Sequence, residues 1–81
     1  MKNISEQDVL GVIEKALKTG PGSIGPDTVA EEVEAWDSLG HLSILTGLDV
    51  LFDGRIADIG EIADATSVPK ILAALRQHSL I

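Results

Sequence analysis

The chain has 81 residues, the size of one small domain spanning 1–81, and its 13 acidic and 6 basic side chains give a net charge of -7. This charge repels nucleic-acid phosphates and anionic membrane surfaces, so we expect neither as a partner and expect basic partners instead. Because there is no cysteine, a disulfide framework, a thiolate zinc site and a cysteine nucleophile are excluded.

The first helix is predicted over residues 5–19, where apolar side chains recur at helical spacing. Ser5 is expected to cap it, because its hydroxyl can accept a hydrogen bond from a free amide of the first turn. Gly20 is expected to take the left-handed conformation that ends the helix, and Pro21 prevents its continuation. The apolar face predicted to meet the core contains Val9, Val12, Ile13, Ala16 and Leu17.

A long loop is predicted over residues 20–36, since three glycines and two prolines fall within its first seven residues. In its second part, Thr28 and Glu31 are expected to cap one short turn. Loops of this length are uncommon in small domains and are often functional. The side chains expected to pack across the core and keep the loop ordered are Ile24, Val29 and Val33.

The second helix is predicted over residues 38–52, with Asp37 as its N-cap. On a helical wheel one broad apolar side contains Ile44, Leu45, Leu48, Leu51 and Phe52, with Leu42 at its edge. The opposite side contains Gly40, Ser43, Thr46 and Gly47. A glycine inside a helix costs about 1 kcal/mol relative to alanine. We therefore expect both glycines to face outward, where they permit another molecule to approach closely.

The last part of the chain is predicted to form a short helix and a longer one. Residues 57–64 predict a short third helix that carries Ile59 and Ile62. Ser67 is the expected N-cap of the last helix, with Pro69 tolerated in its first turn. Its expected inward side chains are Val68, Ile71, Leu72 and Leu75. With no strand pattern present, the sequence predicts an all-α fold of three main helices and one short helix, with a long first loop.

The motif Asp37-Ser38-Leu39 lies where the second helix begins. A residue at this place lies beside unpaired backbone N–H groups, which together with the helix dipole favour a phosphate group. A phosphodiester on the Ser38 hydroxyl would be stabilised there, and Asp37 adds a carboxylate that can hold Mg²⁺ or orient a partner enzyme. The alternative is that Asp37 only caps the helix and Ser38 is an ordinary first-turn residue, because short motifs occur by chance.

This motif opens a leucine-rich helix in a short, acidic chain with a long first loop. Through this combination, and above all through the segments WDSLGHLSIL and LDVLFDGRI, the chain resembles an acyl carrier protein from Ser5 to about Gln77. The resemblance implies a four-helix bundle with a minor third helix. It also implies that Ser38 carries 4′-phosphopantetheine, derived from coenzyme A, with Asp37 and Leu39 as its motif neighbours.

The resemblance implies a freestanding carrier without catalytic activity of its own. Such a carrier holds acyl intermediates as thioesters on its arm and passes them between enzymes of a fatty-acid-like or polyketide pathway. The expected partners are a phosphopantetheinyl transferase and acyl-loading, condensing or acyl-transfer enzymes. The arm ends in a thiol, so the chain itself needs no cysteine. Residues that either line an acyl shelter or simply fill the core are Leu42, Leu45, Ile59, Ile62 and Leu72.

The surface expected to meet partner enzymes departs from the family pattern. In many members the second helix presents several acidic side chains, at positions that here hold Gly40, Ser43, Asp49, Val50 and Leu51. Only Asp49 is acidic, so we hypothesise a flatter and more apolar surface with acids at its rim. Trp36 is expected to pack against the arm or a partner, or to anchor the loop. The expected partner-binding residues are Trp36, Gly40, His41, Ser43, Gly47, Asp49 and Val50.

Other functions stay open beside the acyl carrier. A peptidyl or aminoacyl carrier of the non-ribosomal type uses the same serine and fold, and an unmodified helical interaction module is a third possibility. A serine hydrolase built from Asp37, Ser38 and His41 is disfavoured, because the strand–turn–helix elbow and the oxyanion loop are missing. The acidic run EEVE is interpreted as a solvated stretch that faces partners, and no metal site is expected.

The expected location is cytoplasmic. No apolar run approaches the roughly 18 residues of a membrane-spanning helix. The first residues also lack the apolar segment of a signal peptide. A monomer is expected, because the helical wheels leave no large apolar face uncovered.

Overall fold

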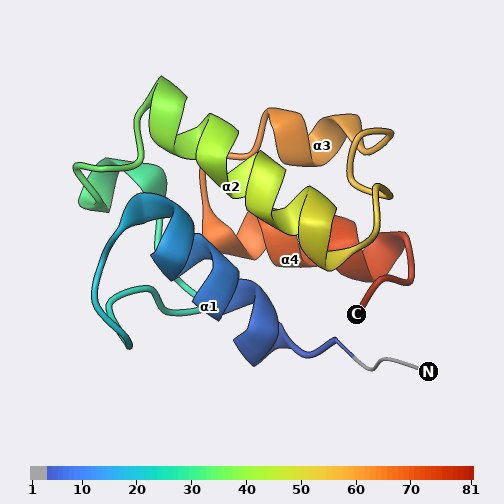
Figure 1. Cartoon of the computed structure of the whole chain (residues 1–81), viewed down its shortest axis with the longest axis horizontal. Coiled ribbons are helices and arrows are strands. Elements are labelled where there is room, and N and C mark those ends of the chain that lie inside the picture. The colour runs from blue at the N-terminus through green and yellow to red at the C-terminus, as the bar shows by residue number, and fades with distance from the viewer. Residues whose placement is uncertain (1–3) are drawn as a thin grey trace.

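The computed structural model describes residues 4–81, which form four α-helices (Figure 1). These are α1 (Glu6–Leu17), α2 (Ser38–Leu51), α3 (Gly60–Ala63) and α4 (Val68–Gln77), with a 3₁₀ turn at Ala30–Glu32. Within the described residues the only β-type pairing is one isolated bridge between Val29 and Ser67. The predicted all-α fold of three main helices, one short helix and a long first loop is therefore confirmed.

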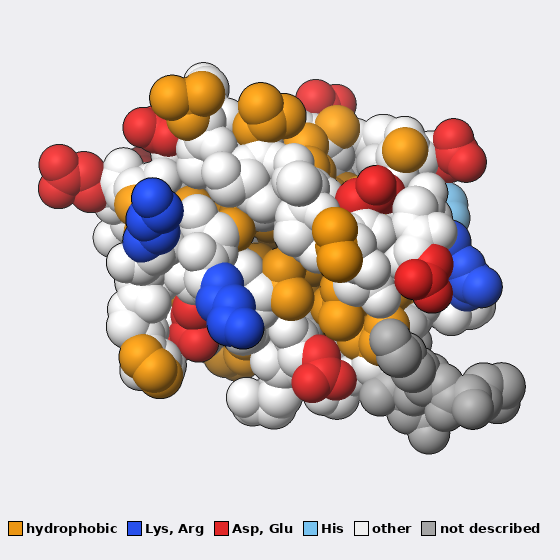
Figure 2. All heavy atoms as spheres, viewed as in Figure 1, with side chains coloured by type: hydrophobic (Ala, Val, Ile, Leu, Met, Phe, Trp, Pro, Cys, Tyr) orange, Lys and Arg blue, Asp and Glu red, His pale blue; other side chains and the backbone are white. Residues whose placement is uncertain are grey.

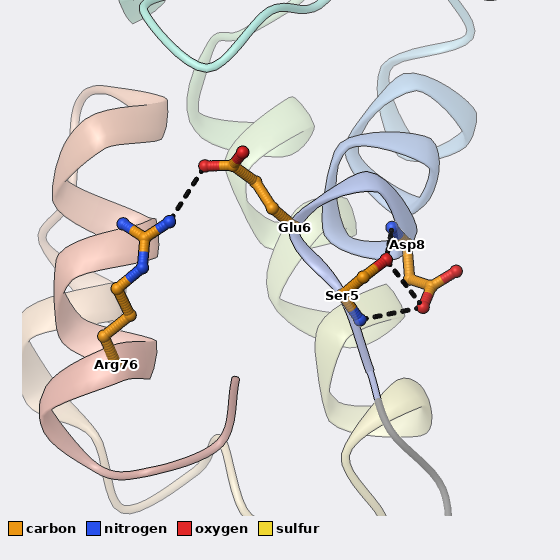
Figure 3. A network of polar contacts seen from close by, with 4 residues as sticks. All are labelled: Ser5, Glu6, Asp8 and Arg76. Carbon is orange, nitrogen blue, oxygen red and sulfur yellow. Dashed lines mark hydrogen bonds and ion pairs between the residues drawn. The ribbon is translucent and has the colours of Figure 1, made fainter.

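Three helices begin directly after the residues predicted to cap them. At α1, the Asp8 amide donates to the Ser5 hydroxyl (3.3 Å), and the Ser5 amide donates to the Asp8 carboxylate (2.9 Å; Figure 3). The Gly40 amide donates to Asp37 (2.8 Å) at the start of α2. At α4, the Lys70 amide donates to the Ser67 hydroxyl (3.3 Å), and Pro69 lies in the first turn as expected. Each cap satisfies an amide that the helix itself leaves unpaired.

The end of α1 differs from the prediction. The helix ends at Leu17, and Lys18, with φ 58°, takes the left-handed conformation that was expected of Gly20. The Lys18 and Thr19 amides then donate to carbonyls of the last helical turn, including that of Glu14. These hydrogen bonds close the helix before the glycine is reached, so the prediction for Gly20 was wrong.

The short turn in the first loop is also displaced by one residue. The Val29 amide donates to the Glu32 carboxylate (3.2 Å), whereas the Thr28 hydroxyl accepts from the Gly25 amide (2.8 Å). The predicted pair of Thr28 and Glu31 is therefore wrong, because the Thr28 side chain is already engaged with the preceding turn. Likewise, α3 is shorter than the predicted helix over 57–64.

The helices enclose a single hydrophobic core. α1 and α2 pack against each other in opposite directions, and the short α3 lies against α4 (Figure 1). The largest fully buried side chains are Val9, Ile13, Ile44, Leu48, Ile62, Val68, Ile71 and Leu75. Ile24 is buried as well, and Val29 and Val33 are partly buried, as predicted. No helix in residues 4–81 has both the length and the apolar character needed to cross a bilayer.

The first loop is tied to the start of α4. The Ala30 amide donates to the Thr66 carbonyl, and the Val68 amide donates to the Thr28 carbonyl, both at 2.8 Å. These two hydrogen bonds hold the loop close to the chain that enters α4. The loop therefore delivers Trp36 and Asp37 to α2 along a fixed path, although it contains only one short helical turn.

The two glycines of α2 lie against α1 and the first loop. A Cβ atom at Gly47 would lie 2.8 Å from Val12 Cγ1, and one at Gly40 would clash with the Ala35 carbonyl and lie 3.0 Å from Leu17 Cδ2. The prediction that both glycines face outward was therefore wrong. A helical wheel sorts positions by how apolar their side chains are. Glycine has no side chain, so the wheel groups a tightly packed glycine with the polar residues on the solvent side.

Candidate functional site

Ser38 is the first residue of α2, and its side chain is exposed. Asp37 provides the cap, since its carboxylate accepts from the Gly40 amide (2.8 Å) and its carbonyl accepts from the His41 amide (2.8 Å). Within residues 4–81 the Ser38 hydroxyl makes no hydrogen bond, and the Ser38 and Leu39 amides have no acceptor. The cap thus leaves a free hydroxyl beside two free backbone donors, an arrangement that suits a phosphate ester.

A hollow of about 420 Å³ adjoins Ser38. Its walls come from the 3₁₀ turn, the start of α2, the end of α3 and the segment that leads into α4. Asp37 and Asp64 line it, and no lysine or arginine does. An anionic group on Ser38 would therefore stay at the rim, near the free amides, while a neutral chain can lie inside the hollow. These residues fit the phosphate end and the neutral stem of a phosphopantetheine arm.

One wall of this hollow is held by a hydrogen-bonded pair of rings, Trp36 and His41. The Trp36 Nε1–H donates to His41 Nδ1 (3.0 Å), and His41 Nε2 lies 3.1 Å from the Ile62 carbonyl and 3.0 Å from that of Ala63. Because Nδ1 accepts, Nε2 carries the proton and donates to the α3 carbonyls. This chain of hydrogen bonds joins the first loop, α2 and α3, and it was not predicted from the sequence.

The position of Trp36 favours one of its expected roles. Its ring is buried, with 7% of its surface exposed, and lies nearly parallel to the His41 ring (12° between planes). It anchors the loop and also lines the hollow beside Ser38. His41 has no ring nitrogen free for Ser38, and the Asp37 carboxylate caps α2, so these side chains do not form a proton relay to the serine.

A second hollow, of about 250 Å³, lies between α2 and the chain from Ile56 to Ala63. Ala63 borders both hollows. Of the five residues considered for an acyl shelter, Leu45 and Ile59 line this second hollow. Ile62 and Leu72 belong to the closed core instead, and Leu42 is 58% exposed rather than at the edge of the buried face.

The exposed face of α2 carries apolar side chains. Leu39 and Val50 are each 76% exposed. Leu42 lies three residues after Leu39, and Val50 lies eight residues after Leu42, so all three are on one side of the helix. Figure 2 shows hydrophobic side chains along the surface over α2, with acidic side chains beside them and at the rim. Three apolar side chains of α2 thus lie in solvent, which the helical wheel did not indicate.

The expected partner-binding residues do not share one surface. Ser43 and Val50 are exposed on α2, whereas His41 and Asp49 are partly buried and Trp36 is buried. The two glycines, Gly40 and Gly47, face α1 and the loop, as described above. Leu39, expected only as a motif neighbour, is more exposed than most of that set. Its exposure was missed because a leucine in a helix is normally interpreted as a core residue.

Comparisons with known proteins give no further assignment: no family model matches the chain, and neither curated proteins nor solved structures give a match. Within residues 4–81, no three histidine or acidic side chains lie close enough to hold a metal ion.

Proposed function

We propose that the protein is a freestanding acyl carrier and that Ser38 is the attachment site of 4′-phosphopantetheine. The observation that supports this most directly is the free, exposed Ser38 hydroxyl at the first turn of a capped helix, beside two amides without acceptors. A serine that served as the cap would be engaged with the helix. Here Asp37 is the N-cap, so the Ser38 hydroxyl is free to be modified.

The attachment step assigns a role to each motif residue. The Ser38 hydroxyl oxygen forms a bond to the phosphorus of coenzyme A that bears the pantetheine, while the pyrophosphate bond breaks and adenosine 3′,5′-bisphosphate leaves. A base of the transferase takes the serine proton. One Asp37 oxygen accepts from Gly40, and the other remains for a Mg²⁺ ion or a basic side chain of the transferase.

The first turn of α2 then stabilises the product. The free Ser38 and Leu39 amides and the positive end of the helix dipole favour the phosphodiester, typically by about 0.3–1 kcal/mol at an exposed site. The arm supplies the thiol that holds the acyl group as a thioester. The hollow beside Ser38, closed on one side by Trp36 and His41, has room for the neutral stem of the arm.

The proposed partners are a phosphopantetheinyl transferase and the enzymes that load, condense or transfer the acyl group. We propose that they contact the exposed α2 face at Leu39, Leu42, Ser43 and Val50, through apolar contact with acidic residues at the rim. The proposal includes a cytoplasmic monomer. A peptidyl or aminoacyl carrier, which attaches its arm to the same serine, is the second candidate.

A mass measurement tests the attachment. The unmodified protein is incubated with coenzyme A, Mg²⁺ and a broad-specificity transferase, and its intact mass is expected to rise by one phosphopantetheine. Ser38→Ala should abolish the gain. Ser23→Ala, which changes another exposed serine that lies in the first loop and outside the proposed contact surface, should leave it intact. No gain in the wild type, or an equal gain in Ser38→Ala, would refute the carrier and leave the unmodified interaction module.

A further inference from the structure

His41 lies between the two hollows. Ser38, His41 and Leu45 follow one another along α2 at spacings of three and four residues, so they share one side of the helix. The first hollow adjoins Ser38 and His41, the second adjoins Leu45, and Ala63 of α3 lines both. A chain attached to Ser38 that follows the seam between α2 and α3 toward the second hollow therefore meets the His41 ring on its way.

Hydrogen bonds at both ring nitrogens close this seam. His41 Nε2 lies 3.1 Å from the Ile62 carbonyl oxygen and 3.0 Å from that of Ala63, and Nδ1 accepts from the Trp36 indole (3.0 Å). Non-bonded carbon atoms keep about 3.5–4.0 Å apart, so a hydrocarbon chain cannot pass between the ring and α3. The ring cannot turn aside without losing contacts to two other parts of the fold, the first loop and α3.

We propose that His41 is a latch, a residue whose hydrogen bonds keep the seam closed and hold a carrier-bound acyl group outside the bundle. The inference rests on the function proposed above and specifies its cargo. An acyl group held outside stays in contact with water, so the arrangement suits short acyl groups, which expose little hydrocarbon. Partner enzymes then reach the thioester without first drawing the chain out of the core.

The second hollow compensates poorly for an open latch. Opening the seam would leave the buried Trp36 N–H without its acceptor, and an unpaired buried donor is costly. In exchange the hollow offers a few aliphatic side chains, Leu45, Ile56 and Ile59 among them. A short chain has few methylene groups to bury against these side chains, so the closed seam is favoured.

Thermal unfolding of loaded proteins tests the latch, because a chain buried only in the folded state stabilises that state and raises its Tm. A transferase attaches acetyl-, butyryl- or hexanoyl-phosphopantetheine to Ser38 from the matching coenzyme A thioester. For the wild type we expect the Tm values of the three forms to agree within about 1 °C. His41→Ala opens the seam, so its hexanoyl form should unfold at least about 5 °C above its acetyl form.

Three further variants separate the latch from a general loosening of the fold. His41→Gln keeps a donor for the α3 carbonyls and should restore the wild-type result. His78→Ala removes a different contact of α3, the one between His78 and Glu61 (3.7 Å), and should show no rise. Trp36→Phe combined with His41→Ala leaves no unpaired indole N–H, so it should fold if the single variant does not, and it should show the same rise.

Several results would overturn the latch. One is a Tm that already rises with chain length in the wild type, and another is the lack of a rise in the variants without His41. A rise in His41→Gln or His78→Ala equal to that in His41→Ala would also overturn it. Failure of all three chains to load onto Ser38 would overturn the carrier function itself, and the latch with it.

Discussion

Gly40→Ala is expected to destabilise the protein even though alanine is the better helix former. Gly40 lies in the first turn of α2, two residues from Ser38, and its missing side chain allows the first loop to lie directly against the helix. A Cβ atom there would clash with the Ala35 carbonyl oxygen and lie 3.0 Å from Leu17 Cδ2. The leucine tip can move, but the backbone carbonyl cannot move without shifting the loop that carries Trp36 and Asp37.

The size of the effect follows from two opposing terms. Replacing a helical glycine by alanine gains about 1 kcal/mol through propensity. Forcing an extra carbon into a closely packed contact costs about 1–3 kcal/mol, and the cost lies at the upper end when the opposing atom belongs to the backbone. The net prediction is a decrease of about 1–2 kcal/mol in the free energy of unfolding.

Urea denaturation measures this change, and Gly11→Ala is the matched control. Gly11 lies inside α1, and a Cβ atom there would have no neighbour within 4 Å, so this variant should gain up to about 1 kcal/mol from propensity alone. Gly40→Ala should also slow the modification of Ser38, because the first turn of α2 must move. A Gly40→Ala protein as stable as the wild type would refute the reasoning.

Two further predictions concern the site. His41→Ala should lower the free energy of unfolding by about 1–3 kcal/mol, because it leaves the buried Trp36 N–H without an acceptor. The control His78→Ala changes an exposed histidine and should alter this free energy by less than about 0.5 kcal/mol. Equal effects of the two variants would contradict the role of the Trp36–His41 pair. Leu42→Ser should raise the transferase KM for the carrier about tenfold through lost apolar contact, with little dependence on salt. A steep salt dependence that Asp49→Asn removes would instead show recognition by charge.

The helices and the place of the candidate site could be predicted because they depend on local chemistry. Ser5, Asp37 and Ser67 each bond to an amide three residues later, so the signal lies within four consecutive residues. The exposure of Ser38 follows from the same rule, since the residue before it takes the cap. The prediction of where α1 ends was wrong because Lys18 takes the left-handed conformation, which most side chains avoid and which is normally expected of a glycine.

The walls of the site could not be predicted, because they join residues that are distant in the sequence. His41 bonds to carbonyls 21 and 22 residues later in the chain, and no spacing rule connects them. The prediction that Gly40 and Gly47 face outward was wrong for a related reason. Whether a glycine faces solvent or a close neighbour depends on how α1 lies against α2, which a single helix does not reveal.

The ring pair beside Ser38 also gives the protein an optical probe of its own. Trp36 is the only tryptophan, and there is no tyrosine, so near-ultraviolet fluorescence comes essentially from one indole. That indole lines the hollow next to the serine and is hydrogen-bonded to His41. Its emission therefore reports the polarity of a single place in the molecule. Events at Ser38, including the attachment proposed above, can therefore be followed in real time on the unlabelled chain.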